Sequence, residues 1–84
     1  MRVIEQFRTE GYIHVPPVRE FVGVGVSEGQ AVVFFIVEKD WYTEGDFDTF
    51  DWLRFSTVEP GYGIPTGDYL GHVDIGGKHV FVYA

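Results

Sequence analysis

The residues whose types and spacing could do chemistry lie between Glu38 and Asp51. This stretch holds six carboxylates, a single cation and four large aromatic rings. Protein interfaces are enriched in such rings, and a rim of carboxylates steers a basic partner toward them. The pattern therefore predicts an acidic, aromatic-rich loop that binds another protein. The predicted partner-binding residues are Trp41, Tyr42, Asp46, Phe47, Asp48, Phe50 and Asp51.

The same rings have a second interpretation, in which they close the core of a small domain and meet no partner. Phe47 and Phe50 have the i, i+3 spacing of one helical turn, which would point both rings the same way. The sequence predicts at most one short helical turn here and leaves open whether the loop is an interface or a lid.

The acidic loop has no pattern of a catalytic or calcium site. The run that begins at Asp46 is similar to the start of an EF-hand loop, but Asp51 stands at the sixth position, where the turn requires glycine. No nucleophile with an adjacent base and no dinucleotide-binding glycine pattern is present. We therefore expect no enzymatic activity, no catalytic residues and no cofactor.

Two histidines and one carboxylate fall on the same face of a predicted hairpin near the end of the chain. A turn at Gly76-Gly77 places Asp74 opposite His79, with His72 on the same side. Such a set could bind a divalent metal, although a cross-strand Asp–His pair is the simpler interpretation. We expect no metal site, and His72, Asp74 and His79 are only weak candidates.

The longest apolar runs lie between Glu20 and Glu38 and predict two strands joined at Glu28-Gly29. That turn sets Ser27 against Gln30, so Val22, Val24 and Val26 would face Phe35, Val33 and Ala31. On the other face Gly23 would oppose Phe34, Gly25 would oppose Val32, and Phe21 would oppose Ile36. The large side chains could cover bare backbone there, or the glycines could admit a ligand. The alternative ligand-binding residues are Gly23, Gly25, Phe34, Arg54, Gly61 and Gly63.

Over the whole chain, the alternation of apolar and polar residues predicts six to seven short strands separated by turns rich in glycine and proline. Residues 53–58 read as one of these strands, and residues 60–68 read as a loop. This spacing is typical of a small antiparallel β-sandwich or a partly open barrel. We expect one all-β domain spanning residues 1–84.

Composition restricts the partners and the compartment. The chain has 84 residues, no cysteine, and thirteen acidic against six basic residues, which gives a net charge of −7. That charge opposes direct binding to nucleic acid or to anionic membranes. The absence of cysteine and of a signal peptide predicts a cytoplasmic protein. Fifteen aromatic residues exceed what one small core hides, so a homodimer or a higher homo-oligomer is expected, with Phe34, Ile36 and either Trp41 or Trp52 buried in the contact. The alternative is a monomeric barrel in which the acidic loop covers one face of the sheet.

The chain as a whole resembles a family of short, uncharacterised all-β proteins from bacteriophages, especially phages of actinobacteria. The resemblance rests on six segments, the last of which leads into an end rich in valine and aromatic residues. These are Val15-Pro16-Pro17, Phe21-Val22-Gly23-Val24-Gly25-Val26, Glu28-Gly29-Gln30, Val33-Phe34-Phe35-Ile36-Val37, Gly61-Tyr62-Gly63-Ile64-Pro65 and Tyr69-Leu70-Gly71. Phe35 and Val82 stand where such proteins have a tryptophan and a histidine, and the stretch from Lys39 to Asp51 departs from their pattern.

The resemblance implies a phage accessory protein and transfers no functional residue. Together with the acidic loop it predicts a protein that binds and inhibits a host protein with a basic surface, in the host cytoplasm. Two alternatives remain open. One is a binder or sponge of a small molecule, such as a nucleotide signal of host immunity, and the other is a minor virion or assembly component.

Overall fold

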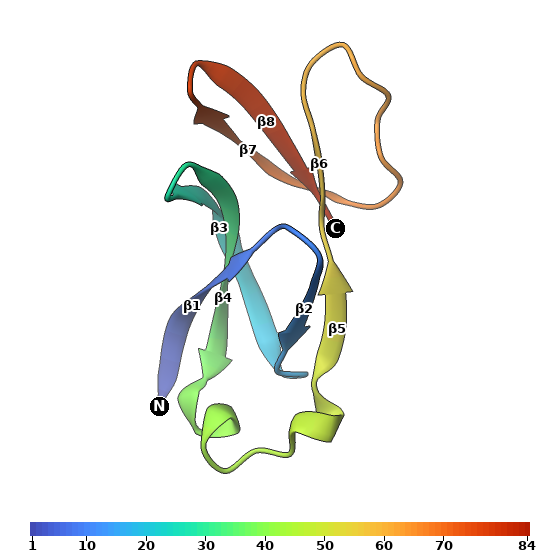
Figure 1. The fold of residues 1–84 in the computed structure, drawn as a ribbon. Helices are drawn as coiled ribbons and strands as arrows, with labels where there is room; N and C mark the ends of the chain where they lie inside the picture. The colour runs from blue at the N-terminus through green and yellow to red at the C-terminus, as the bar shows by residue number, and fades with distance from the viewer.

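Eight antiparallel β-strands run through residues 1–84 of the computed structural model, which describes the whole chain (Figure 1). The prediction of an all-β chain is confirmed. The strands are β1 (Arg2–Arg8), β2 (Tyr12–Val15), β3 (Arg19–Ser27), β4 (Gln30–Glu38), β5 (Asp51–Arg54), β6 (Ser56–Val58), β7 (Tyr69–Ile75) and β8 (Lys78–Tyr83).

The strands form three small sheets with the orders β1-β4-β3, β2-β5 and β6-β8-β7. The strand predicted over residues 53–58 is in fact two strands, because the chain leaves one sheet and enters another at Phe55. Before that residue β5 pairs with β2, and after it β6 pairs with β8. Phe55 itself is 5% exposed. Its buried ring fixes the point at which the chain changes sheets.

The acidic loop contains two 3-10 turns, η1 (Lys39–Tyr42) and η2 (Phe47–Thr49), where the sequence predicts one helical turn. The carboxylate of Asp46 caps η2 by accepting a hydrogen bond from the backbone N–H of Asp48, with an N–O distance of 3.0 Å. These turns are the only helical segments, and neither has the length or the apolar run required to cross a membrane.

The predicted register of the central hairpin holds from the Ser27–Gln30 pair to the Gly23–Phe34 pair. A β-bulge then adds one residue to β3 at Val22, so Phe21 pairs with Phe35 and Glu20 with Ile36. The predicted pairs Val22–Phe35 and Phe21–Ile36 are therefore wrong. Because of the bulge, the ring of Phe21 reaches the core side, with its centroid 5.8 Å from that of Phe35.

The outer face of the hairpin is covered at one of its two glycines. A Cβ atom built on Gly25 would lie 2.7 Å from Cε2 of Phe34, so the ring of Phe34 rests directly on the bare backbone. A Cβ atom on Gly23 would meet nothing within 4 Å. A large side chain therefore covers the bare backbone at Gly25, as one of the two interpretations predicts, whereas the backbone at Gly23 is uncovered.

One hydrophobic core joins the three sheets, and strand β4 supplies four of its nine residues. The core consists of Ile13, Val15, Ala31, Val33, Phe35, Val37, Phe55, Val73 and Val82. The molecule is elongated, with extents of 44 × 23 × 17 Å. Figure 1 shows the acidic loop at one end, below β4 and β5, and the β7–β8 hairpin at the other.

Strands β3 and β7 meet at a close contact between Val24 and Gly71. Gly71 has φ of +155°, and a Cβ atom built there would lie 2.8 Å from Cγ2 of Val24. A side chain at Gly71 would force two sheets apart and strain the backbone.

We predict that Gly71→Ala destabilises the protein by about 1–3 kcal/mol, as overpacking in a core does. In a domain of this size each kcal/mol lowers the melting temperature by roughly 4–8 °C. The matched control is Gly23→Ala, which has open space for the added methyl group and should cause no loss. Thermal unfolding followed by circular dichroism measures both, and equal melting temperatures for the two variants would contradict the close contact.

Candidate functional site: the acidic aromatic loop

The acidic aromatic loop, residues 38–51, is built around the ring of Phe50, which is 6% exposed. Four other rings surround it. The centroid distances from Phe50 are 4.8 Å to Phe47, 5.1 Å to His14, 5.9 Å to Tyr42 and 6.2 Å to Trp41. Edge-to-face and tilted aromatic pairs at these distances are each worth about 0.5–1.5 kcal/mol beyond the area they bury. The loop therefore has a small aromatic core of its own.

The two interpretations of the rings apply to different residues. Tyr42 packs against the main core, whereas Phe50 is buried among the rings of the loop itself. Phe47 is 51% exposed and Trp41 is half-buried, so these two present ring surface to the outside. Of the predicted anchors, Trp41 and Phe47 expose part of their rings, and both pack on the buried ring of Phe50.

Trp41 lies in a shallow hollow whose rim is made of carboxylates. The hollow is lined by Glu38, Asp40, Trp41, Glu44, Gly45 and Asp46, and the tryptophan is its single large apolar side chain. Glu38 forms an ion pair with the amino group of Met1, which also lies 3.6 Å from a carboxylate oxygen of Asp40. Glu44 is in no ion pair. A lysine or arginine side chain would find both negative charge and an aromatic face here.

The predicted carboxylates have different roles. Asp46 lines the hollow and caps η2, and Asp48 is exposed and free of ion pairs. Asp51 lies at the start of β5, where its carboxylate binds the guanidinium of Arg19 at 2.6 Å. Asp51 therefore anchors the strand and does not line the hollow. The sequence pattern missed Glu38, Asp40 and Glu44 as neighbours of Trp41, because their distances depend on how η1 turns.

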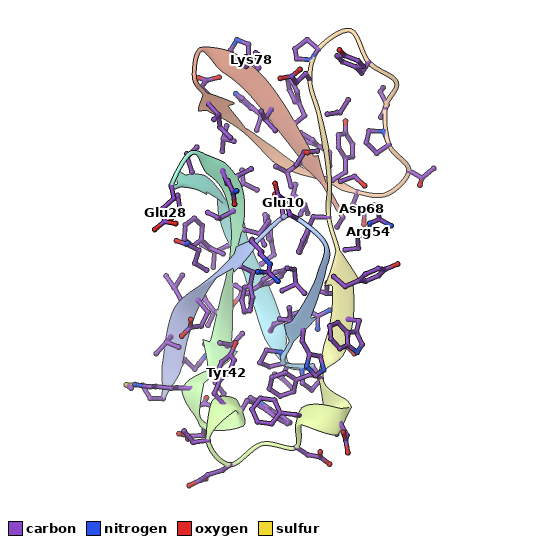
Figure 2. The ribbon with its side chains drawn as sticks, viewed as in Figure 1. Glu10, Glu28, Tyr42, Arg54, Asp68 and Lys78 are labelled. Carbon is purple, nitrogen blue, oxygen red and sulfur yellow. The ribbon has the colours of Figure 1, made fainter.

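Tyr42 carries a polar group with no partner. Its hydroxyl oxygen is buried and makes no hydrogen bond. Burial raises the pKa of the Tyr42 phenol above its ordinary value of 10.0, and the nearby carboxylate of Glu5 on β1 raises it further. Both effects disfavour the phenolate. Figure 2 shows Tyr42 at the end of the molecule that carries the loop.

The histidines do not assemble a metal site. Asp74 pairs with His79 across the β7–β8 hairpin as predicted, and the two are in ion-pair contact. His72 interacts instead with the hydroxyl of Tyr69, at 3.3 Å from its Nδ1 atom. No three metal-ligating side chains converge anywhere in the chain. The third histidine, His14, stacks on Trp52 with a centroid distance of 4.3 Å.

The residues of the alternative ligand site form no common pocket within one chain, although Phe34 pairs with Gly23 and lies on Gly25. Among Gly23, Gly25, Phe34, Arg54, Gly61 and Gly63, Arg54 alone lines a pocket. Gly61 and Gly63 belong to the exposed loop between β6 and β7, and Phe34 rests on Gly25.

We predict that Tyr42→Phe stabilises the fold by about 1 kcal/mol, because it removes a buried hydroxyl that has lost water and gained no partner. The advantage should grow above about pH 10. Above that pH the Tyr42 side chain is ionised in the unfolded chain but still protonated in the folded one, because folding raises its pKa. The free energy of unfolding of the parent chain therefore falls as the pH rises. Urea unfolding at pH 7 and at pH 10.5 measures both effects. A variant less stable than the parent chain would show that the hydroxyl has a partner.

Comparison of the chain with protein-family models, with curated proteins and with solved structures finds no match. No residue role is therefore transferred from a relative, and the acidic aromatic loop is the candidate site on its own geometry.

Proposed function

We propose that this protein acts without catalysis, by binding a basic surface of a partner protein through the acidic aromatic loop. The observation that carries the proposal is the exposed face of Trp41 within a rim of four carboxylates. A cation desolvated against a tryptophan ring gains about 1–2 kcal/mol, and the surrounding carboxylates add attraction. A lysine or arginine of the partner fits this surface better than any neutral side chain.

The charge distribution supports the same partner. The chain carries seven net negative charges, and Lys39 is the single cation of the loop. A surface of one sign raises the rate of encounter with a surface of the opposite sign, and salt weakens this effect. Binding should therefore be faster at low ionic strength.

The aromatic core of the loop gives the surface a fixed shape. Trp41 and Phe47 both pack on Phe50, so little side-chain freedom remains to be lost when a partner binds. Tryptophan is also among the residues most enriched at binding hot spots. Trp41 is accordingly proposed as the central anchor and Phe47 as a peripheral one.

The resemblance to phage proteins supplies the context of this proposal. The partner would be a host protein whose activity is blocked, and the place of action would be the host cytoplasm. A nucleotide sponge is less well supported, because no pocket of one chain combines its expected residues on the β3–β4 hairpin with Arg54 or with the glycines of the β6–β7 loop. No observation favours a virion component.

We predict that Glu44→Gln combined with Asp48→Asn removes partners captured from a host lysate, with at least tenfold lower recovery. These two carboxylates are exposed and in no ion pair, so the fold should not change. The matched control is Glu10→Gln with Glu28→Gln, an equal charge change at exposed positions away from the loop (Figure 2).

Affinity capture at about 50 and 300 mM salt, read by mass spectrometry, distinguishes the two double variants. Trp41→Ala should abolish the same captures. Recovery of an identical set of proteins by the parent chain and by all three variants would refute binding through the acidic aromatic loop.

We further propose that the protein forms a homodimer through the outer face of the β1-β4-β3 sheet. On this face Ile4 is 62% exposed, and its neighbours Phe34 and Ile36 are half-buried. A symmetric contact would cover all three at once and would need to bury about 1,200 Å² in total to be stable.

For the dimer, sedimentation equilibrium at micromolar concentration should give twice the chain mass of 9.6 kDa. Ile4→Asp should give a monomer, because the added charge would be buried at the contact. Ile64→Asp is the control, since Ile64 is 80% exposed on the loop between β6 and β7. A 9.6 kDa species of the parent chain across the whole range would exclude the dimer.

A further inference from the structure

A second concave surface lies between the end of β1 and the β2–β5 pair, and its chemistry differs from that of the acidic hollow. This β1–β2 cleft is open to solvent and has a volume of about 450 Å³. No carboxylate lines it, although thirteen side chains of the protein are acidic. Its lining residues are Gln6, Phe7, Arg8, Tyr12, Ile13, His14 and Trp52.

The aromatic wall of the cleft belongs to the outer face of the β2–β5 pair. Residues that pair across an antiparallel ladder point to the same face, so His14 and Trp52 lie side by side. Their rings are stacked, with centroids 4.3 Å apart and an angle of 11° between the planes. The Trp52 side chain is nevertheless 65% exposed. The indole is therefore held by His14 on one face and has its other face free for a further ring.

Two arginines beside these rings have no carboxylate partner. Arg8, at the end of β1, is exposed, lines the cleft and is in no ion pair. Arg54 is also unpaired, and its guanidinium lies over the ring of Tyr12, 5.5 Å from the centroid. Arg54 is not a lining residue, but it places a second positive charge on a ring that is one. Lys39 is the only other basic side chain without an ion pair.

The polar side chains of the cleft are free to bind a ligand. Neither the guanidinium of Arg8 nor the imidazole of His14 makes a hydrogen bond within the chain, and the amide of Gln6 makes none either. The cleft therefore combines an unused cation, unused amide and imidazole groups and an open aromatic face.

We propose that the β1–β2 cleft binds a nucleotide, with its base stacked on the free face of Trp52 and its phosphate bound by Arg8. Arginine donates paired, charge-assisted hydrogen bonds to phosphate. Stacking on an aromatic side chain accepts any base, because each base has a π face, so the cleft specifies no particular base. The volume of about 450 Å³ falls within the range of small-molecule sites.

A base joined to a phosphate also occurs in single-stranded nucleic acid, but the charges favour a free nucleotide. The cleft adjoins the acidic aromatic loop, because His14 packs on Phe50 with a centroid distance of 5.1 Å. Each further phosphate of a strand would meet the negative field of a chain with a net charge of −7, and only two unpaired arginines lie at the cleft.

Adenosine monophosphate (AMP) is the probe, and adenosine is its uncharged counterpart. The chain has two tryptophans, so the two indole N–H signals of the ¹⁵N-labelled protein report on the cleft and on the acidic hollow separately. In an NMR titration, AMP should shift the indole signal of Trp52, leave that of Trp41 in place and saturate in the millimolar range. Adenosine should bind about tenfold more weakly, because it lacks the phosphate. A tetra-adenylate strand should bind no more tightly than AMP.

Arg8→Gln should weaken AMP binding by about tenfold and should leave adenosine binding unchanged. The matched control is Arg2→Gln, an equal charge change at an exposed position on the same strand, outside the cleft. Trp52→Leu removes the stacking face and should weaken both ligands by about tenfold. Because Arg8 is exposed and unpaired, the Arg8 variant should fold and tests the proposal even if the Trp52 variant does not fold.

Three results would overturn nucleotide binding at this cleft: no shift of the Trp52 indole signal by AMP, equal affinity for AMP and adenosine, or unchanged AMP affinity in Arg8→Gln. Binding of tetra-adenylate about tenfold tighter than that of AMP would contradict the free nucleotide as the ligand. None of these results bears on partner capture by the acidic aromatic loop, because the cleft and the hollow around Trp41 share no lining residue.

Discussion

The fold depends on burying both faces of strand β4. Its inner side chains Ala31, Val33, Phe35 and Val37 are all at most 7% exposed, and on its outer face Val32 is 3% exposed. A strand apolar on both sides is stable only where both faces are covered. Strands β1 and β3 pair with its two edges. On the inner face, the β2-β5 and β6-β8-β7 sheets complete the core. On the outer face, the ring of Phe34 lies on the backbone of Gly25. What remains exposed on that outer face is the apolar surface around Ile4.

The acidic aromatic loop is the segment by which the chain leaves this central sheet. The acidic aromatic loop joins the end of β4 to the start of β5, and these strands belong to different sheets. Phe50 is buried in that connection, where the rings around it form a separate aromatic cluster, and Tyr42 joins this cluster to the main core. Four carboxylates lie beside the half-buried Trp41. The amino group of Met1 contacts two of them, Glu38 and Asp40, and so offsets part of their mutual repulsion, while the packing of Trp41 on Phe50 holds the loop in place.

Local patterns in the sequence predict the local structure well. Turns at Glu28-Gly29 and Gly76-Gly77, the hairpin registers next to them and the Asp74–His79 pair all follow from the two-residue side-chain period and from turn chemistry. The bulge at Val22 and the change of sheet at Phe55 do not, because alternation continues through both. Both depend on pairing with strands that are far away in the sequence, and a short stretch of residues does not reveal such partners. The carboxylates lie around Trp41 because of the way the chain turns at η1, and the pattern of residue types does not specify that turn.

The placement of charge, more than its total, determines what each surface can bind. Three of the six basic side chains are paired with carboxylates, in the contacts Arg2–Glu20, Arg19–Asp51 and Lys78–Glu59. Arg19 holds Asp51 at the start of β5, and this pairing removes one carboxylate from the acidic surface. Arg54 lies over the ring of Tyr12 and is in no ion pair, and Glu44 and Asp48 in the acidic aromatic loop are also unpaired. Exposed charges are screened from one another beyond about 10 Å, so the unpaired carboxylates of the loop and the unpaired arginines outside it act as separate surfaces of a chain with a net charge of −7.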